Sequence, residues 1–277
     1  MRLSRVALLA LAMAPFANGL PAPADVVVNT FAPFSATPTA GVWYQSGVAS
    51  GGVASIVDLT GAGGNLEFNQ PLPPGAAKLT TDGTIASRAE VGVQNDFGLA
   101  GTVLNALSLN YTYYKKAGGD PTPAPSLKLR FFNFSTGGFT SLVYEPYQNL
   151  SGPVPTDTWT TVSINSTTGT FWTTGGFGQP NGNGGGTQLT LSGWLSQFNS
   201  GFAGATLYEV AIGLGSNNPN QVGYFDKVVI DGSKQANVTY NFQPVPEPST
   251  LALGGLAMGL GVAAAAARRR AAKAPLA

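Results

Sequence analysis

The chain has 277 residues, a formal net charge of +1 and only 10% charged residues, with 37 glycines, 20 prolines and neither cysteine nor histidine. Without cysteine and histidine it has no disulfides, no thiolate or imidazole metal ligands, and no Cys/His or Ser/His catalytic arrangement. Several of the basic residues lie at the two ends of the chain. The remainder therefore lacks the basic surface that binding to nucleic acid requires.

Residues 1–24 have the three parts of a secretory signal peptide. Arg2 and Arg5 supply the positive region, and the stretch 6–16 is apolar but too short to span a bilayer. The sequence Ala-Pro-Ala at 22–24 offers the small residues that a signal peptidase accepts. We expect cleavage before Asp25 and export of the rest of the chain.

The segment 25–240 is predicted to be one all-β domain. Short stretches in which apolar and polar residues alternate with a period of two are separated by Gly, Pro, Asn and Asp, and only 191–200 favours a helix. In 126–134, for example, leucines alternate with Lys128 and Arg130. Many short strands in one domain predict a two-sheet β-sandwich or jelly roll. Glycine-rich stretches at 61–65, 117–126 and 175–186 predict loops.

Aromatic residues are candidates for stacking against a sugar ring. Trp159 has the parity opposite to Val162 and Ile164, so it either forms an exposed platform or precedes a bulge and belongs to the core. The interpretation as a core residue is favoured. The other aromatic candidates are Trp43, Tyr44, Trp172 and Trp194.

Asp226 is a candidate ligand of a structural calcium ion. It shares the parity of Tyr224, Val228 and Ile230, which suggests an apolar face, and a buried carboxylate needs a donor, a cationic partner or a metal ion. A hydrogen-bonded structural aspartate is the favoured alternative. We expect no other cofactor.

Glycoside hydrolysis needs two carboxylates on either side of the scissile bond. The domain contains Glu67, Glu90, Glu145 and Glu209, but no pair of them is clustered on one predicted strand. We therefore expect a protein without enzymatic activity.

The end of the chain has a distinctive order of parts. A proline-rich linker (241–250) contains Val245, Pro246, Glu247 and Pro248, and an uncharged stretch (251–267) and a basic tail (268–277) follow it. The stretch of 17 residues would reach about 25 Å as a helix, close to the ~30 Å of a hydrocarbon core, which predicts a single transmembrane helix. The positive-inside rule places Arg268, Arg269 and Arg270 in the cytoplasm and the domain before them outside.

These parts, in this order and spacing, resemble the PEP-CTERM sorting signal of bacterial surface proteins. The resemblance covers about thirty residues and implies recognition by exosortase, a membrane-embedded processing enzyme. It also implies cleavage near Pro246–Pro248. The protein would then be anchored in the membrane until processing and afterwards lie at the cell surface or in the extracellular matrix.

The segments 156–164 and 209–232 are similar to exported jelly-roll domains that often carry this sorting tail and that resemble carbohydrate-binding modules. Taken together, the sequence favours an exported structural or adhesive component of a surface matrix. A carbohydrate-binding module that retains exopolysaccharide is the alternative, and a glycoside hydrolase is a weaker one.

Overall fold

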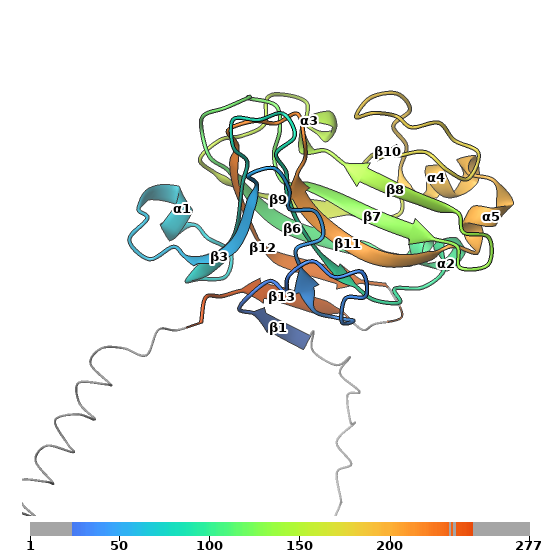
Figure 1. Cartoon of the computed structure of the whole chain (residues 1–277), viewed down its shortest axis with the longest axis horizontal. Helices are drawn as coiled ribbons and strands as arrows, with labels where there is room; N and C mark the ends of the chain where they lie inside the picture. The colour runs from blue at the N-terminus through green and yellow to red at the C-terminus, as the bar shows by residue number, and fades with distance from the viewer. Residues whose placement is uncertain (1–23, 233, 235–236, 246–277) are drawn as a thin grey trace, which may run out of the picture.

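The computed structural model describes residues 24–232, 234 and 237–245, and in this part of the chain the predicted two-sheet β-sandwich is confirmed (Figure 1). Sheet A has seven strands and sheet B has six. The strands of sheet A are β1 (Ala24–Val28), β3 (Val53–Asp58), β4 (Gly75–Thr80), β6 (Ser108–Lys115), β9 (Trp159–Ile164), β12 (Val222–Asp231) and β13 (Val238–Phe242). The strands of sheet B are β2 (Trp43–Tyr44), β5 (Ala89–Gln94), β7 (Ser126–Phe132), β8 (Phe139–Tyr144), β10 (Trp172–Thr173) and β11 (Thr206–Leu214).

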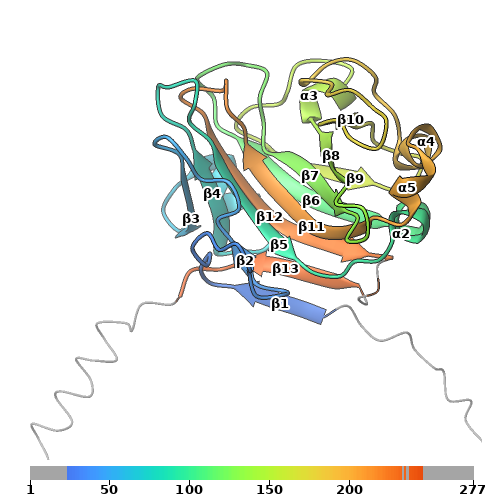
Figure 2. The ribbon, with the colours of Figure 1, turned by 45° about the vertical axis from the view of Figure 1, so that its right-hand side comes forward.

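Sheet A divides along β12. One edge of β12 pairs with β6 throughout, and β6 pairs in turn with β9. The other edge pairs first with β4, over 222–225, and then with β13, over 228–230. The N-terminal strand β1 runs parallel to β13 at the margin of the sheet (Figure 2). Sheet B has the simple order β10-β8-β7-β11-β5-β2.

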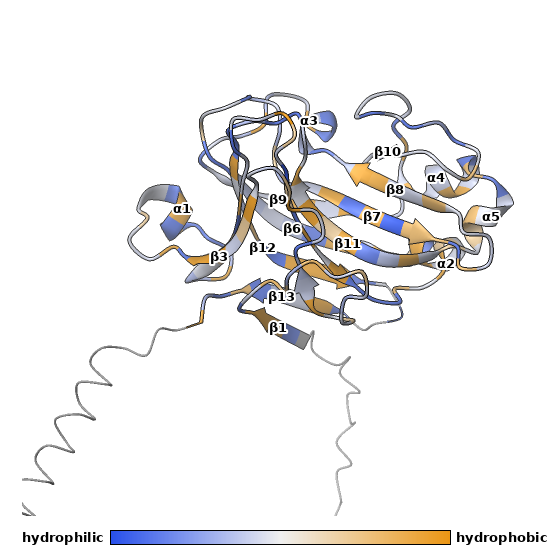
Figure 3. Ribbon diagram, in the orientation of Figure 1, coloured by the Kyte–Doolittle hydropathy of each residue, from blue (hydrophilic) through white to orange (hydrophobic). Residues whose placement is uncertain are grey.

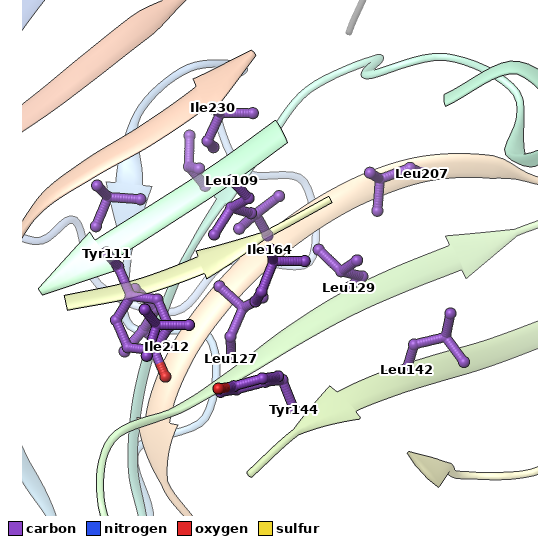
Figure 4. Close-up of a cluster of buried hydrophobic side chains, with 14 of the residues drawn as sticks. Leu109, Tyr111, Leu127, Leu129, Leu142, Tyr144, Ile164, Leu207, Ile212 and Ile230 are labelled. Atoms are coloured by element: carbon purple, nitrogen blue, oxygen red, sulfur yellow. The ribbon is translucent and has the colours of Figure 1, made fainter. Parts of the chain in front are cut away.

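The core lies between the sheets and follows from the alternation in the sequence. Leu109, Ile164 and Ile230 from sheet A face Leu129 and other aliphatic side chains of sheet B (Figure 4). Each such fully buried side chain contributes roughly 1.5–3 kcal/mol to the free energy of folding. The hydrophilic residues of β7 alternate with hydrophobic ones along the strand, as Figure 3 shows, so the opposite face of sheet B is polar.

Three short helices gather at one end of the sandwich (Figure 1): α2 (Ala100–Ala106), α4 (Leu191–Gln197) and α5 (Ser200–Ala203). They bury Leu104, Trp194 and Phe202, among others, against the ends of the sheets. The helix predicted at 191–200 is therefore confirmed as α4, which Thr190 caps by accepting a hydrogen bond from the Gly193 N–H. Helix α1 (Gly64–Phe68) lies partly in a segment predicted as loop, and α3 (Pro146–Asn149) follows β8.

Candidate functional site

The outer face of sheet B carries an ion-pair network. Glu90 on β5 accepts hydrogen bonds from Lys128 and Arg130 on β7, and Arg130 Nη1 donates to Glu209 Oε1 at 2.6 Å. A β-bulge between Leu207 and Glu209 aligns Glu209 with Arg130. Glu90 and Glu209 are almost completely buried, so neither is free to act on a ligand.

The pKa values of Glu90 and Tyr44 show how strongly the groups of this network interact. Burial by itself would raise the pKa of Glu90, but the charges of Lys128 and Arg130 outweigh burial and hold that pKa at about 2. Tyr44 donates its hydroxyl proton to Glu209 Oε2 at 2.9 Å, and burial together with the Glu209 charge raises the pKa of this tyrosine far above its ordinary value. These side chains thus form a fixed, ionised layer on the outer face of sheet B, which is called the floor below.

Above this floor lies a cleft of about 830 Å³. Its lining is mostly polar and charged, with a few aromatic side chains among these groups. Tyr208, Phe139 and Trp172 come from strands β11, β8 and β10, and Ser141 and Lys128 add hydrogen-bonding groups between them. The cleft therefore crosses at least four neighbouring strands of sheet B.

Glu145 lines the same cleft, at the end of β8. Burial raises the pKa of its carboxyl group to about 7, although the charge of Lys128 counteracts the rise. Lys128 is already paired with Glu90, and no ion pair of Glu145 is found in the described part of the chain. Near neutral pH, Glu145 thus offers the cleft a mixture of a neutral acid, which can donate a hydrogen bond, and a carboxylate.

One wall of the cleft is the glycine-rich loop that follows β10. Its residues Asn183 and Gly184 line the cleft. The carbonyl of Gly184 accepts hydrogen bonds from the Tyr147 hydroxyl and the Gln148 side chain, both on α3. The loop predicted at 175–186 is confirmed as a loop without regular strands or helices, and it is tied to the cleft by these bonds.

A second wall of the cleft depends on Lys115. Its side chain is 1% exposed, and its Nζ donates to Asp120 O at 2.7 Å, Pro123 O at 2.7 Å and Gln221 Oε1 at 3.0 Å. Asp120, Thr122 and Pro123 line the cleft, and so do residues 215–218 of the loop before β12. One buried ammonium group therefore joins the two loops that form this wall.

The structure separates the aromatic candidates. Trp43 is 1% exposed and packs against Phe225 and Phe242, so the interpretation as a glycan platform is wrong for it. Tyr44 is 4% exposed, and its hydroxyl belongs to the ion-pair network, so it is not a platform either. Trp194 is buried at the helical end of the sandwich, with its indole N–H bonded to Phe171 O at 2.7 Å. Among these aromatics, Trp172 is half-buried and lines the cleft.

Trp159 lies on the outer face of sheet A, as its parity indicates. The pairing of β9 with β6 has no register shift, so the interpretation that a bulge turns Trp159 into the core is wrong. Its ring packs 5.4 Å from that of Tyr114, and its indole N–H donates to Leu66 O on α1 at 3.2 Å. Helix α1 thus covers Trp159 instead of leaving it open as a platform.

Asp226 is fully buried, but not on the apolar face that its parity suggests. The β12–β6 register shifts between Asp226 and Val229, where Lys227 has a φ of 52°. This bulge leaves Tyr224 in a small outer cluster and sends Val228 to the main core. Asp226 Oδ1 accepts a hydrogen bond from the Phe242 N–H at 3.1 Å. Burial raises the pKa of Asp226 to about 7, against the effect of such backbone donors.

No group of three or more acidic, histidine or cysteine side chains within the described residues is arranged to hold a metal ion. Oδ2 of Asp226 has no hydrogen-bond partner in that part of the chain. A lone carboxylate oxygen falls short of the six to eight oxygen ligands that calcium takes. A calcium site at Asp226 therefore stays a prediction with one ligand identified.

The sorting signal falls almost entirely outside the described residues. Val245 is included and is 64% exposed, whereas Pro246, Glu247, Pro248, the predicted transmembrane helix 251–267 and Arg268–Arg270 lie beyond them. Residues 1–23 of the predicted signal peptide 1–24 also lie outside the described residues. Among the helices of the described part, none has the length and apolar character needed to cross a membrane.

Fold and site together define a β-sandwich with an aromatic and polar cleft on the outer face of one sheet. No protein-family model matches the chain, and a search of curated proteins finds no match.

Solved structures with a similar fold do exist. The chain is similar to the family 11 carbohydrate-binding module from Clostridium thermocellum in complex with a β-1,3-1,4-mixed-linked tetrasaccharide. The TM-score is 0.40 and the identity 12% over 69% of this chain and 89% of that one. For the family 11 module of the cellulase Lic26A-Cel5E of the same organism, the TM-score is 0.38 and the identity 14% over 69% of this chain and 88% of that one. For TmCBM61 in complex with β-1,4-galactotriose, the TM-score is 0.31 and the identity 9% over 65% of this chain and 82% of that one. At these values the likeness concerns the fold and carries no argument about function.

Proposed function

We propose that this protein is an exported, non-catalytic module that binds a polysaccharide in the cleft on sheet B. The observation that supports the proposal is the lining of the cleft, where Trp172, Tyr208 and Phe139 stand among hydroxyl, amide and charged groups. A sugar ring has apolar C–H faces and a rim of hydroxyl groups, so it needs both kinds of partner at once.

The cleft favours this function over a purely structural one. The cleft of about 830 Å³ brings aromatic, hydroxyl, amide and charged groups together on one surface, where a ligand can contact all of them at once. The ionised floor fixes the β7, β11 and β5 side chains beneath the cleft, so the surface is organised before a ligand arrives. Pre-organisation of this kind lowers the entropic cost of binding.

Binding also fits the carboxylates better than hydrolysis does. Glu90 and Glu209 are held in ion pairs, and Glu145 and Asp120 are the acidic side chains among those that line the cleft. Asp120 accepts a backbone hydrogen bond from Thr122, within its own turn. A retaining or inverting hydrolase needs a free nucleophile or base opposite the acid.

Export and surface attachment are the second part of the proposal, and they rest on the sequence of the two ends. A signal peptide at 1–24 and a PEP-CTERM-like tail at 241–277 would bring the sandwich to the cell surface. There the signal peptidase and an exosortase-type enzyme would be its processing partners, and an exopolysaccharide its ligand.

The binding proposal is tested by affinity electrophoresis of the protein through gels that contain soluble polysaccharides. The test variant is Trp172→Ala, and the matched control is Trp159→Ala, which removes a half-buried tryptophan from the outer face of the other sheet. We expect Trp172→Ala to weaken binding about tenfold or more, as for an aromatic anchor worth at least ~1.4 kcal/mol. The control should bind like the wild type.

The proposal fails if no polysaccharide of a broad panel retards the wild-type protein. It also fails if a polysaccharide retards the wild-type protein and both variants bind that polysaccharide as strongly as the wild type does. Circular dichroism of both variants shows whether the sandwich is intact in each case.

A further inference from the structure

Two Asn-Gly dipeptides, 181–182 and 183–184, follow one another in the loop that forms one wall of the cleft. In such a dipeptide the backbone nitrogen of the glycine can attack the side-chain carbonyl carbon of the asparagine. Glycine permits this attack best because it has no Cβ to obstruct the approach. The sequence alone makes the two positions equivalent.

The fold protects the first dipeptide. The Gly182 N–H donates to Thr173 O at 2.8 Å, so the nitrogen that would attack is bound to β10. The side-chain oxygen of Asn181 accepts a hydrogen bond from the Asn183 N–H at 2.9 Å, which fixes the group that would be attacked. A Cβ on Gly182 would lie 2.8 Å from Gly185 O, so this part of the loop is also tightly packed.

The second dipeptide has none of these restraints. Asn183 is exposed, and no hydrogen bond from the Gly184 N–H is found among the described residues. A Cβ placed on Gly184 would meet no atom within 4 Å, so the space beside this glycine is open. Both Asn183 and Gly184 have positive φ angles, of 49° and 75°, which describe an exposed turn and not a strand.

We propose that Asn183 is a site of spontaneous, fold-selected deamidation that places a new carboxylate on the wall of the cleft. The Gly184 nitrogen gives its proton to solvent base and bonds to Cγ of Asn183. The bond from Cγ to the side-chain nitrogen breaks, and ammonia leaves with a proton from water. Water then opens the resulting succinimide ring at either carbonyl, which yields aspartate or isoaspartate.

The product changes the wall in two ways. It adds a negative charge at a residue that lines the cleft, on the same side as Glu145 and the α3 side chains that bind this loop. Isoaspartate also lengthens the backbone by one methylene group. This insertion displaces the Gly184 carbonyl from the Tyr147 hydroxyl, now 3.3 Å away, and from Gln148.

The test is peptide mapping by mass spectrometry after the full chain has been kept folded in warm, mildly alkaline buffer. A parallel sample is kept unfolded in urea. We expect conversion of Asn183 and retention of Asn181 in the folded sample, and conversion of both in the unfolded one. Asn183→Gln should remove the converted species, since glutamine must close a larger ring, and Asn183 should still convert in Asn181→Gln.

Two results would overturn the proposal. One is equal conversion of Asn181 and Asn183 in the folded protein, which would mean that the fold does not select between them. The other is an intact Asn183 in the folded protein over a period in which the unfolded chain is converted. Neither readout depends on the identity of the ligand or on binding in the cleft.

Discussion

Asp226 imposes a pH-dependent cost on the stability of the sandwich, and Asp226→Asn should remove it. The carboxyl group is fully buried, and one of its oxygens accepts the Phe242 N–H where β12 leaves β4 and joins β13. Burial raises its pKa from the ordinary value of 3.8 to about 7. The folded protein therefore keeps the proton over a range of pH in which the unfolded chain has lost it.

The direction and size of the effect follow from this difference. Below about pH 4 the group is protonated in both states and costs nothing. As the pH rises from about 4 to about 7, only the unfolded chain loses the proton, so the free energy of unfolding falls throughout that window and stays low above it. At 1.36 kcal/mol per pKa unit, the pKa change corresponds to a loss on the order of 4 kcal/mol.

Asp226→Asn keeps an acceptor for the Phe242 N–H but cannot ionise. Its amide N–H2 takes the place of Oδ2, which has no partner in the described structure, and this should cost about 1 kcal/mol. We expect the variant to be less stable than the wild type near pH 4 and more stable near pH 8.

The measurement is the free energy of urea unfolding at several pH values, for the wild type, Asp226→Asn and the control Asp231→Asn, a partly buried aspartate on the same strand. Equal slopes against pH for the wild type and Asp226→Asn would refute the reasoning. If added calcium stabilises the wild type but not Asp226→Asn, Asp226 is ionised and holds a cation instead.

Two further predictions concern the cleft. Lys115→Met should lower the free energy of unfolding by about 3 kcal/mol, because three oxygens lose their donor and two of them belong to buried residues. It should also speed proteolysis of the loop 117–125. The control is Lys116→Met at the adjacent exposed lysine, and equal stability of the two variants would contradict the role of Lys115 in joining the two loops. If polysaccharide binding uses the neutral form of Glu145, affinity should fall as the pH rises through about 7, the pKa of that group, whereas Glu145→Gln should show a flat profile in the same titration. A wild-type affinity that is constant across this pH range would contradict a role for the proton of Glu145.

The sequence was sufficient for the class of fold and for the core. Alternation in segments such as 126–134 assigns Leu127 and Leu129 to the interior and Lys128 and Arg130 to the outer face, because side chains of a strand point alternately to its two sides. It also identified the helix at 191–200, where Trp194 and Phe198 recur at helical spacing. These features are local, so a short window of sequence contains the information.

The candidate site was visible only in part. The charges of Lys128 and Arg130 could be recognised as a polar face, but the sequence does not show that Glu90, 40 residues before Arg130, completes their network. Glu145, Tyr208 and Lys115 were not distinguished from other polar or aromatic residues of the chain. Their importance depends on which strands become neighbours, and pairing between distant strands leaves no local pattern.

What the sequence by itself determined is the alternation, and with it a two-sheet sandwich, together with the order of parts at both ends that predicts export. Tertiary structure alone decided which aromatic side chains are free. The same indole ring is buried at Trp43, covered by a helix at Trp159 and open to a cleft at Trp172. The physical reason is that exposure depends on what packs above a residue, and segments far away in the chain supply that cover.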